Sequence, residues 1–140
     1  MTEEQSIDVG LVLWQCGLEG YRTFQNLTTL CEHTATHMTA CRYELLKRFQ
    51  FNHVCVEHMT KIGPNGTEAL KTLFNQGKTL NGGHYRATSV LPHYNPLKCH
   101  QAAMGALFVW RFRFMSEPFP DFRDPASWYH RPLYRPMRVR

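Results

Sequence analysis

Hydrophobic residues recur at three- and four-residue steps through the first third of the chain, which is the spacing of one buried helix face. Two such series flank a stretch of small residues at 34–40. We therefore expect two packed helices, with Thr36 or Thr39 as the N-cap of the second. The first series comprises Tyr21, Phe24, Leu27, Leu30 and Thr34, and the second comprises Cys41, Leu45, Leu46 and Phe49.

Three extended segments follow the helical region. Val54–Met59 is short and rich in β-branched residues, and it precedes the helix-breaking sequence Gly63-Pro64-Asn65-Gly66. Residues 67–75 and 84–91 are two further candidates, joined by 76–83. Three glycines and one asparagine in this connection permit the positive φ angles of a hairpin tip. The pattern thus predicts one strand, a loop and a β-hairpin.

The last third of the chain predicts one buried helix and an irregular tail. Asn95-Pro96 has the composition of a helix start, and small and apolar residues continue from Cys99 to Trp110. Residues 116–140 are rich in Pro and Arg, so we expect irregular structure with short helical turns there. The predicted fold is α+β and mainly helical, with a small antiparallel sheet, in a single domain over 1–140.

Composition narrows the class of protein. Of the 140 residues, 43% are hydrophobic and 19% are charged, which is typical of a globular chain. The longest apolar run, Val9–Leu18, is interrupted by two glycines and a glutamine, so it does not predict a membrane span. Glu3 and Glu4 lie where a secretory signal requires positive charge. We expect a soluble intracellular protein without a membrane partner.

The net charge of +5 is concentrated in one part of the chain. Basic and acidic residues balance over Met1–Leu97, whereas Lys98–Arg140 holds eight basic and three acidic residues. Seven of these eight are arginines among aromatic residues, a composition that attracts phosphate groups. A solvated surface or a segment that docks a partner protein is the alternative interpretation.

The cysteines predict neither disulfides nor a structural zinc site. Their number is odd and no Cys-x-x-Cys pair occurs, so we expect reduced thiols buried as small hydrophobic residues. Four residues within one short segment could form a small metal site, but no structural-zinc spacing is matched and we interpret them as helix-packing residues. No metal and no cofactor are predicted. The cysteines are Cys16, Cys31, Cys41, Cys55 and Cys99, and the four-residue group is Cys31, His33, His37 and Cys41.

Two basic residues have distinctive positions. Lys78 follows Gly77 at the predicted hairpin tip, but Thr72 stands where a P-loop requires glycine, so no nucleotide-binding loop is predicted. A lysine at such a tip can approach a phosphate, or it can be an ordinary exposed side chain. Arg42 lies in an otherwise apolar helical series, where an ion pair with Glu44 or Glu57 is the structural interpretation. No spacing favours a hydrolase triad.

Six separated blocks, taken together over roughly Met38–Leu133, resemble a known family. They look like the tyrosine-recombinase-like domain shared by Crypton mobile elements and the large DNA-binding subunit of the budding-yeast centromere-binding complex, of the type called domain II. Several blocks in the right order are more specific than any single motif. The blocks are Arg42–Phe51 (RYELLKRFQF), Gln76–Thr79 (QGKT), Leu91–Cys99 (LPHYNPLKC), Gly105–Phe112 (GALFVWRF), Glu117–Phe122 (EPFPDF) and Trp128-Tyr129.

The resemblance implies a fold like the catalytic core of a tyrosine recombinase. Arg42 matches the first active-site arginine, which holds the scissile phosphate, and Lys78 matches the lysine of the β-hairpin. The two are therefore expected to converge on one DNA backbone. The sequence departs from the family pattern at Tyr43, Leu80 and His100, where Gly, Asn and Pro are usual.

The resemblance also implies binding without catalysis. Recombinases need a His-x-x-Arg pair, which occurs nowhere in this sequence, and a later nucleophilic tyrosine. We therefore predict a nuclear, non-catalytic binder of double-stranded DNA at centromeres, with a second copy or other chromosomal proteins as further partners. The predicted DNA contacts are Arg42, Lys47, Lys78, Arg86, Lys98, Arg111 and Arg113.

Two alternatives stay open at this point. The chain could be a truncated fragment of a Crypton transposase or tyrosine recombinase, or a protein-interaction relic that does not bind DNA. Coding sequence that continued into a His-x-x-Arg pair and a tyrosine would favour the first.

Overall fold

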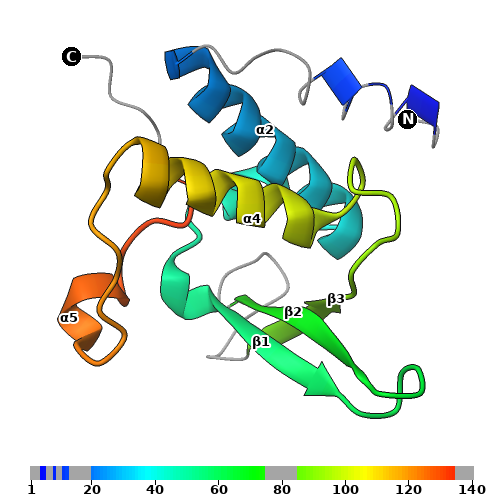
Figure 1. Cartoon of the computed structure of the whole chain (residues 1–140). Coiled ribbons are helices and arrows are strands. Elements are labelled where there is room, and N and C mark those ends of the chain that lie inside the picture. Colours follow the sequence, from blue (N-terminus) through cyan, green and yellow to red (C-terminus); the bar gives the residue numbers. More distant parts are fainter. Residues whose placement is uncertain (1–3, 6–7, 9–10, 13–19, 75–84, 135–140) are drawn as a thin grey trace.

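A computed structural model describes residues 4–5, 8, 11–12, 20–74 and 85–134, and it has the predicted α+β class (Figure 1). Four helices and three strands are named over these residues, together with a 3-10 turn and a π-helical turn. The helices are α2 (Gly20–Thr39), α3 (Tyr43–Leu46), α4 (His100–Val109) and α5 (Pro125–Trp128); the strands are β1 (Val54–Met59), β2 (Thr67–Phe74) and β3 (Arg86–Val90); the turns are Phe51–His53 and Trp110–Phe114.

The core lies where α2 packs against α4, on one side of the sheet (Figure 1). The apolar series of the first predicted helix supplies the α2 half, because its three- and four-residue spacing places these side chains on one face. Leu30 and Leu107 have no exposed surface, and Phe74 brings the end of β2 into the same cluster. The other buried members are Phe24, Leu27, Cys31, Ala35, Leu46, Phe49, Phe51, Ala103, Met104, Leu133 and Tyr134.

The sheet is antiparallel in the order β1-β2-β3, which confirms the predicted strand, loop and hairpin. Register pairs Met59 with Thr67 at one end and Phe74 with Arg86 at the other. The first turn requires glycine at Gly66, where φ is +72° and an added Cβ would lie 2.7 Å from the His58 ring. The predicted tip of the second hairpin, with Lys78, lies outside the described residues.

The second predicted helix is much shorter than its apolar pattern suggested. Ala40 has a φ of +52°, which ends α2, and α3 then has only four residues. The predicted N-caps are wrong, because Thr36 and Thr39 lie inside α2 and donate to the carbonyls four residues earlier. The N-cap position of α3 is Arg42, whose side chain makes no capping hydrogen bond.

The predicted start of α4 at Asn95-Pro96 is also wrong. Asn95 Oδ1 accepts from the N–H of Leu97 at 3.0 Å, and the N–H of Lys98 donates to the Asn95 carbonyl at 3.1 Å. These bonds close a turn rather than a helix, and α4 begins at His100. An Asn-Pro pair is common both at helix starts and in turns, so the sequence placed the start of α4 at Asn95-Pro96, five residues before the observed start at His100.

A buried polar contact joins α2, α4 and the end of the described chain. His100 Nδ1 lies 3.0 Å from Thr34 Oγ1, and His100 Nε2 lies 3.5 Å from the Tyr134 hydroxyl. Burial lowers the pKa of His100 to about 4, so the ring is neutral at physiological pH. The residue that departs from the family pattern at this position therefore ties three segments together.

The four described cysteines are free, but only two of them are buried as expected. Cys31 and Cys99 are buried, Cys41 is half-buried, and Cys55 is exposed on β1, where the prediction is wrong. Burial raises the pKa of the Cys31 thiol, which disfavours its use as a metal ligand. Within the described ranges, no group of three or more metal-ligating side chains occurs.

The segment beyond Met115 is largely irregular, as predicted for the Pro-rich tail. Its one described helix, α5, is a single turn whose N-cap Asp124 accepts from the N–H of Ala126 at 3.1 Å. Pro125 occupies the first helical position, where its missing N–H has no cost. Residues 135–140 lie outside the described part of the chain.

Candidate nucleic-acid interface

A pocket of about 310 Å³ lies between the turn that follows α3 and the end of β2. The ring centroids of Phe49 and Phe74 are 5.1 Å apart and both side chains are buried, which gives the pocket a rigid aromatic base. Its polar lining comes from the chain just after α3 and from the 3-10 turn. The lining residues are Leu45, Arg48, Phe49, Gln50, His53, Leu73 and Phe74.

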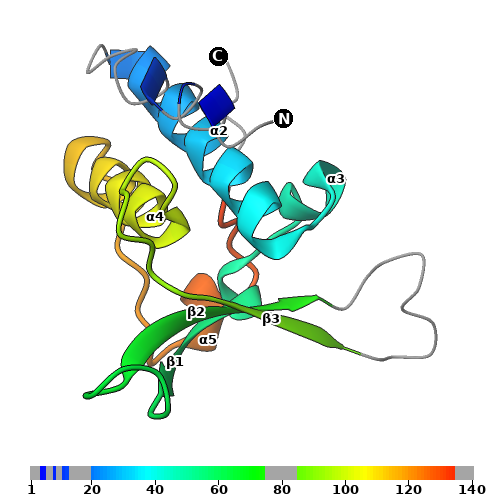
Figure 2. The same cartoon turned by 90° about the vertical axis from the view of Figure 1, so that its right-hand side faces the viewer.

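Three of the predicted DNA contacts lie around this pocket. Arg42 begins its helical wall, because the Arg42 carbonyl accepts from the N–H of the lining residue Leu45 at 2.9 Å. Arg86 is directly opposite the lining residue Phe74 in the sheet register, and Lys47 follows α3. Figure 2 shows α3 and this end of the sheet on the same side of the molecule. The structure therefore places Arg86 on the same side of the molecule as Arg42 and Lys47, about 40 positions earlier in the sequence.

The side chain of Arg42 is exposed, which contradicts the expectation that it belongs to a buried helical series. Its backbone is extended, with φ −70° and ψ 138°. The predicted ion pairs are also wrong, because Glu44 pairs with Lys47 at 3.5 Å and Glu57 pairs with Lys71 at 3.1 Å. No ion pair of Arg42 occurs within the part of the chain that the structure describes.

Two other predicted contacts lie elsewhere. Lys98 belongs to the loop before α4, and Arg113 belongs to the π-helical turn after α4, so the length of α4 separates them. In Figure 2 both ends of α4 lie on the opposite side of the view from α3 and from the paired ends of β2 and β3. One duplex face centred on the pocket therefore does not include Lys98 and Arg113.

Arg111 does not fit a phosphate contact, because its side chain has no exposed surface. Its Nε and Nη2 donate to the two carboxylate oxygens of Glu117 at 2.7 and 2.8 Å, and Nη1 donates to the Leu133 carbonyl at 2.6 Å. Arg131 Nε donates to the same carboxylate at 3.0 Å. Arg111 thus holds the C-terminal segment against the core, and the sequence prediction for this residue is wrong.

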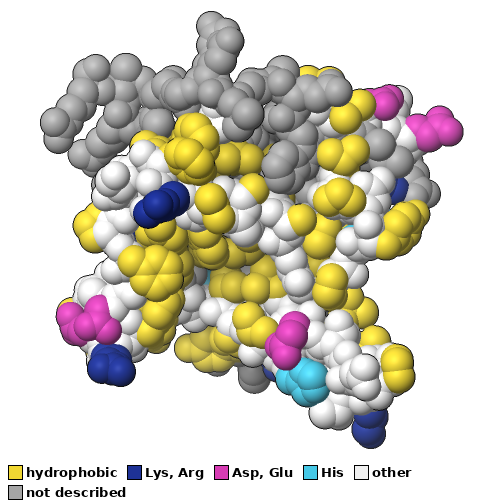
Figure 3. Space-filling model, viewed as in Figure 1, with side chains coloured by type: hydrophobic (Ala, Val, Ile, Leu, Met, Phe, Trp, Pro, Cys, Tyr) yellow, Lys and Arg dark blue, Asp and Glu magenta, His cyan; other side chains and the backbone are white. Residues whose placement is uncertain are grey.

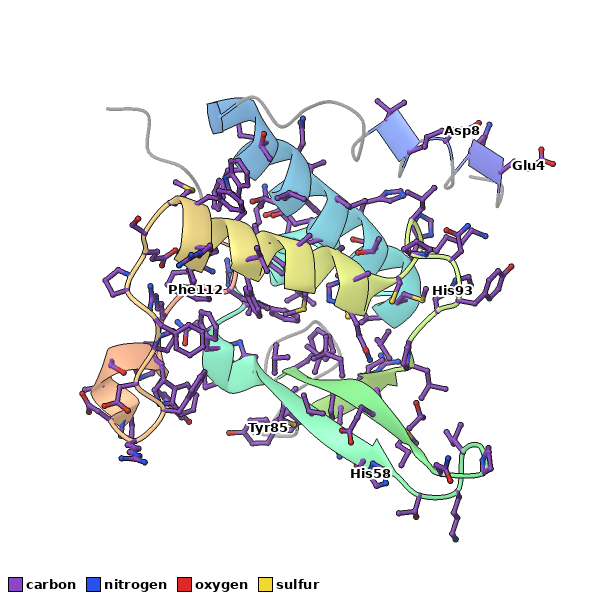
Figure 4. The ribbon with its side chains drawn as sticks, in the orientation of Figure 1. Glu4, Asp8, His58, Tyr85, His93 and Phe112 are labelled. Atoms are coloured by element: carbon purple, nitrogen blue, oxygen red, sulfur yellow. The ribbon has the colours of Figure 1, made fainter. Side chains whose placement is uncertain are left out.

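The face shown in Figure 3 differs from the pocket side. Hydrophobic side chains gather over the end of α4 and the segment that leads to α5, whereas Lys and Arg are scattered singly (Figure 3). Phe112 lies there between the end of α4 and α5 (Figure 4), with the Phe119 ring centroid at 5.0 Å. Phe119 and Phe122 are 69% and 56% exposed. This surface does not have the charge expected of a DNA interface.

The comparison with known families decides what kind of protein this is. The model of the centromere DNA-binding protein complex CBF3 subunit, domain 2, matches residues 18–139. The chain belongs to this family. No curated protein and no solved structure matches the chain. Within the described residues, no helix is long and apolar enough to cross a bilayer.

The match to the CBF3 subunit family covers the pocket and its surroundings, including two residues that sequence reasoning missed. In the sequence, Arg48 was noted as a member of the Arg42–Phe51 block and as one charge in the balanced segment Met1–Leu97, and His53 was not singled out. Their shared signal is weak, since both are polar residues interspersed among the apolar Leu45, Phe49 and Phe51. Arg48 and His53 line a pocket only because the end of β2, with Leu73 and Phe74, packs beside their segment.

Hydrogen bonds fix the protonation of the pocket wall. The backbone N–H of Gln50 donates to His53 Nδ1 at 3.2 Å, so the proton of the neutral ring is on Nε2. Burial, and then the charge of His130, lower the pKa of His53. His130 Nδ1 in turn lies 3.1 Å from Gln50 Oε1, which is its acceptor. The wall therefore offers N–H donors, and none of the seven lining residues is acidic.

Proposed function

We propose that this chain binds double-stranded DNA through the side of the molecule that carries the pocket, as a subunit of a centromere complex. The observation that carries the proposal is the family match over 18–139 together with Arg42, Lys47, Arg48 and Arg86 around one pocket. Guanidinium and ammonium groups bind backbone phosphates without reading the bases, so binding is sequence-tolerant.

We further propose that the domain derives from a tyrosine recombinase and no longer cleaves DNA. The support is the resemblance of its sequence blocks and the lack of any His-x-x-Arg in the sequence. Without that pair, the second arginine and the histidine that stabilise the phosphorane in recombinases have no counterpart in this sequence. The chain acts in the nucleus, with other proteins of the complex as partners, and self-association stays open to measurement by sedimentation.

The binding test is a gel-shift or anisotropy titration against unrelated duplexes at rising salt. Each phosphate contact contributes about −0.9 to the slope of log affinity against log salt. Arg42→Gln and Arg86→Gln together reduce the magnitude of this slope by about 2 and weaken binding to all duplexes alike. A slope that is flat for the unmodified protein overturns the proposal.

A matched control removes charge at the other end of the sheet. Lys61 is exposed in the turn between β1 and β2, next to the Met59–Thr67 end of the register. Lys61→Gln changes the net charge by one without touching the pocket side, so its slope stays close to that of the unmodified protein. Equal losses for Lys61→Gln and Arg86→Gln would show non-specific attraction by net charge alone.

The test for cleavage is a search for a covalent protein–DNA adduct on nicked duplexes. Tyr85 is the described phenol nearest in sequence to Arg86, and it is 72% exposed (Figure 4). No adduct is expected with the unmodified protein. An adduct that disappears in Tyr85→Phe would contradict the loss of chemistry.

A further inference from the structure

The polar wall of the pocket has a chemistry that neither the sequence blocks nor the family description assigns. Its three polar residues, Arg48, Gln50 and His53, come from one stretch of chain between α3 and β1. Each can present an N–H donor toward a ligand. A pocket wall that presents N–H donors and no carboxylate suits an oxyanion rather than a cation.

His53 and Gln50 are held in place before any ligand arrives. His53 Nδ1 is occupied by the N–H of Gln50, which leaves Nε2–H as the donor of the ring. Gln50 Oε1 accepts from His130, which leaves the Gln50 amide N–H groups as donors. Pre-set donors bind an anion without the entropic cost of ordering them.

The rest of the pocket strengthens such an interaction. The buried Phe49 and Phe74 rings and the half-buried Leu45 and Leu73 exclude water on the inner side. Low-dielectric walls raise the attraction between a guanidinium and a phosphate above its value in bulk water. The volume of about 310 Å³ admits a phosphate together with its attached sugar.

We propose that this pocket binds one phosphate of the DNA backbone, with Arg48 supplying the charge and His53 Nε2–H a directed hydrogen bond. The inference rests on the proposed DNA binding and deepens it, because it identifies a single phosphate site at the centre of the surface. Arg42 on the helical wall and Arg86 on the strand opposite Phe74 then contact neighbouring phosphates.

A pH dependence follows from the placement of His53. The charged or titratable groups that face it are Arg48 beside the pocket and His130 beyond α5, while β2 contributes only Leu73 and Phe74. Burial, and then the charge of His130, favour the neutral His53 ring when no ligand is bound. A bound phosphate reverses this preference, so DNA binding takes up a proton and affinity rises as the pH falls from 7.5 to 5.5.

The test is a fluorescence-anisotropy titration of the full chain with a labelled duplex, across salt and pH. Arg48→Gln is expected to weaken binding about tenfold and to reduce the magnitude of the salt slope by about 0.9, while Arg48→Lys retains most of the slope. His53→Gln is expected to remove most of the pH dependence. Thermal unfolding of each variant establishes that it is folded.

Matched controls lie away from the pocket. Arg123→Gln removes an exposed arginine beside α5, and His58→Gln removes an exposed histidine whose Nδ1 lies 2.9 Å from Glu68 Oε1. If Arg48→Gln behaves like Arg123→Gln, and His53→Gln like His58→Gln, while the unmodified protein still binds DNA, the pocket proposal is overturned and the proposed function stands.

A second arm separates the pocket from DNA binding. Inorganic phosphate is titrated into the protein while the imidazole ¹H–¹⁵N signals are followed by NMR. The His53 signal is expected to shift, and the shift is lost in Arg48→Gln. If this occurs in a protein that binds no duplex, the phosphate pocket stands and the proposed function fails; if the signal does not shift and no duplex binds, both fail.

Discussion

Arg111 and Arg48 show two opposite uses of the same side chain. Arg111 is fully buried, and its guanidinium is bonded to the Glu117 carboxylate and to main-chain carbonyls. Arg48 is exposed and lines the pocket, and none of the seven described lining residues is acidic. The carboxylate of Glu117 makes Arg111 part of the core, whereas the Arg48 side chain lies at the surface beside the pocket.

The difference teaches that a local count of basic residues does not locate a binding surface. The charge excess of the last third of the chain includes Arg111 and Arg131, which are both bound to Glu117. The basic residues around the pocket come from Met1–Leu97, the segment whose charge balances to zero.

The largest expected effect is the loss of stability when Arg111 is replaced. Arg111→Met leaves the Glu117 carboxylate without its main buried partner, so we expect a loss of about 3 to 5 kcal/mol in the free energy of unfolding. Arg48→Gln is expected to change it by less than about 0.5 kcal/mol. Urea denaturation of both variants measures the two changes in the free energy of unfolding. Equal changes would contradict the different structural roles of Arg111 and Arg48.

The second effect is the loss of stability when Glu117 is replaced, and its size depends on pH. Burial alone would raise the pKa of Glu117, but hydrogen bonds from Arg111 and Arg131, together with their charges, lower it to about 2. A carboxyl with a depressed pKa stabilises the fold above its ordinary value of 4.5 and loses that contribution as the pH falls toward 2. Glu117→Gln should cost about 2 kcal/mol at neutral pH.

Stability measured between pH 7 and 2 gives the diagnostic result for Glu117. The difference between Glu117→Gln and the unmodified protein should shrink steadily below pH 4.5. A constant difference across this range would mean that the charge of Glu117 does not stabilise the C-terminal segment.

An effect of similar size on stability, confined to mildly acidic pH, is expected from the buried His100. Because burial lowers its pKa to about 4, the unfolded state binds a proton first as the pH falls. The fold therefore has its full stability above about pH 6.5 and loses about 2 kcal/mol by pH 5 from this group. His100→Gln should flatten this part of the stability profile, and a profile as steep as that of the unmodified protein would contradict the assignment.

The smallest effect is expected at Lys47. Its ion pair with Glu44 is exposed, with an N–O distance of 3.5 Å, and such pairs contribute less than about 1 kcal/mol. Lys47→Ala should leave the melting temperature almost unchanged and weaken DNA binding less than Arg42→Gln does. A larger loss of DNA affinity for Lys47→Ala would move the centre of the interface from the pocket toward α3.

Much of the fold could be read from local patterns. The α2 series, the three strands and the apolar content of α4 were predicted because each depends on a periodicity of two or of about 3.6 residues. The boundaries were predicted less well. Asn95-Pro96 stabilises a turn as readily as a helix start, and the end of α2 depends on the single positive φ of Ala40, which no local pattern of alanine signals.

The site could be predicted only in part. Arg42, Lys47 and Arg86 were predicted as DNA contacts and lie on elements that border the pocket. Arg111 was predicted as a contact from its charge alone, and that charge does not reveal that the side chain is buried. Arg48 lies in the Arg42–Phe51 block, where the resemblance assigns a role only to Arg42, and His53 lies outside every block, so both were missed. That Lys78 contacts DNA stays a prediction, because this residue lies outside the described part of the chain.

The amino-acid order alone determined which segments coil, which extend and where positive charge is available, because these properties depend on neighbours within a few positions. Only the tertiary structure decided which arginine is buried and which is exposed. That choice depends on whether a carboxylate and carbonyls from distant segments meet the guanidinium, and the free energy of desolvating a charge makes the two outcomes mutually exclusive.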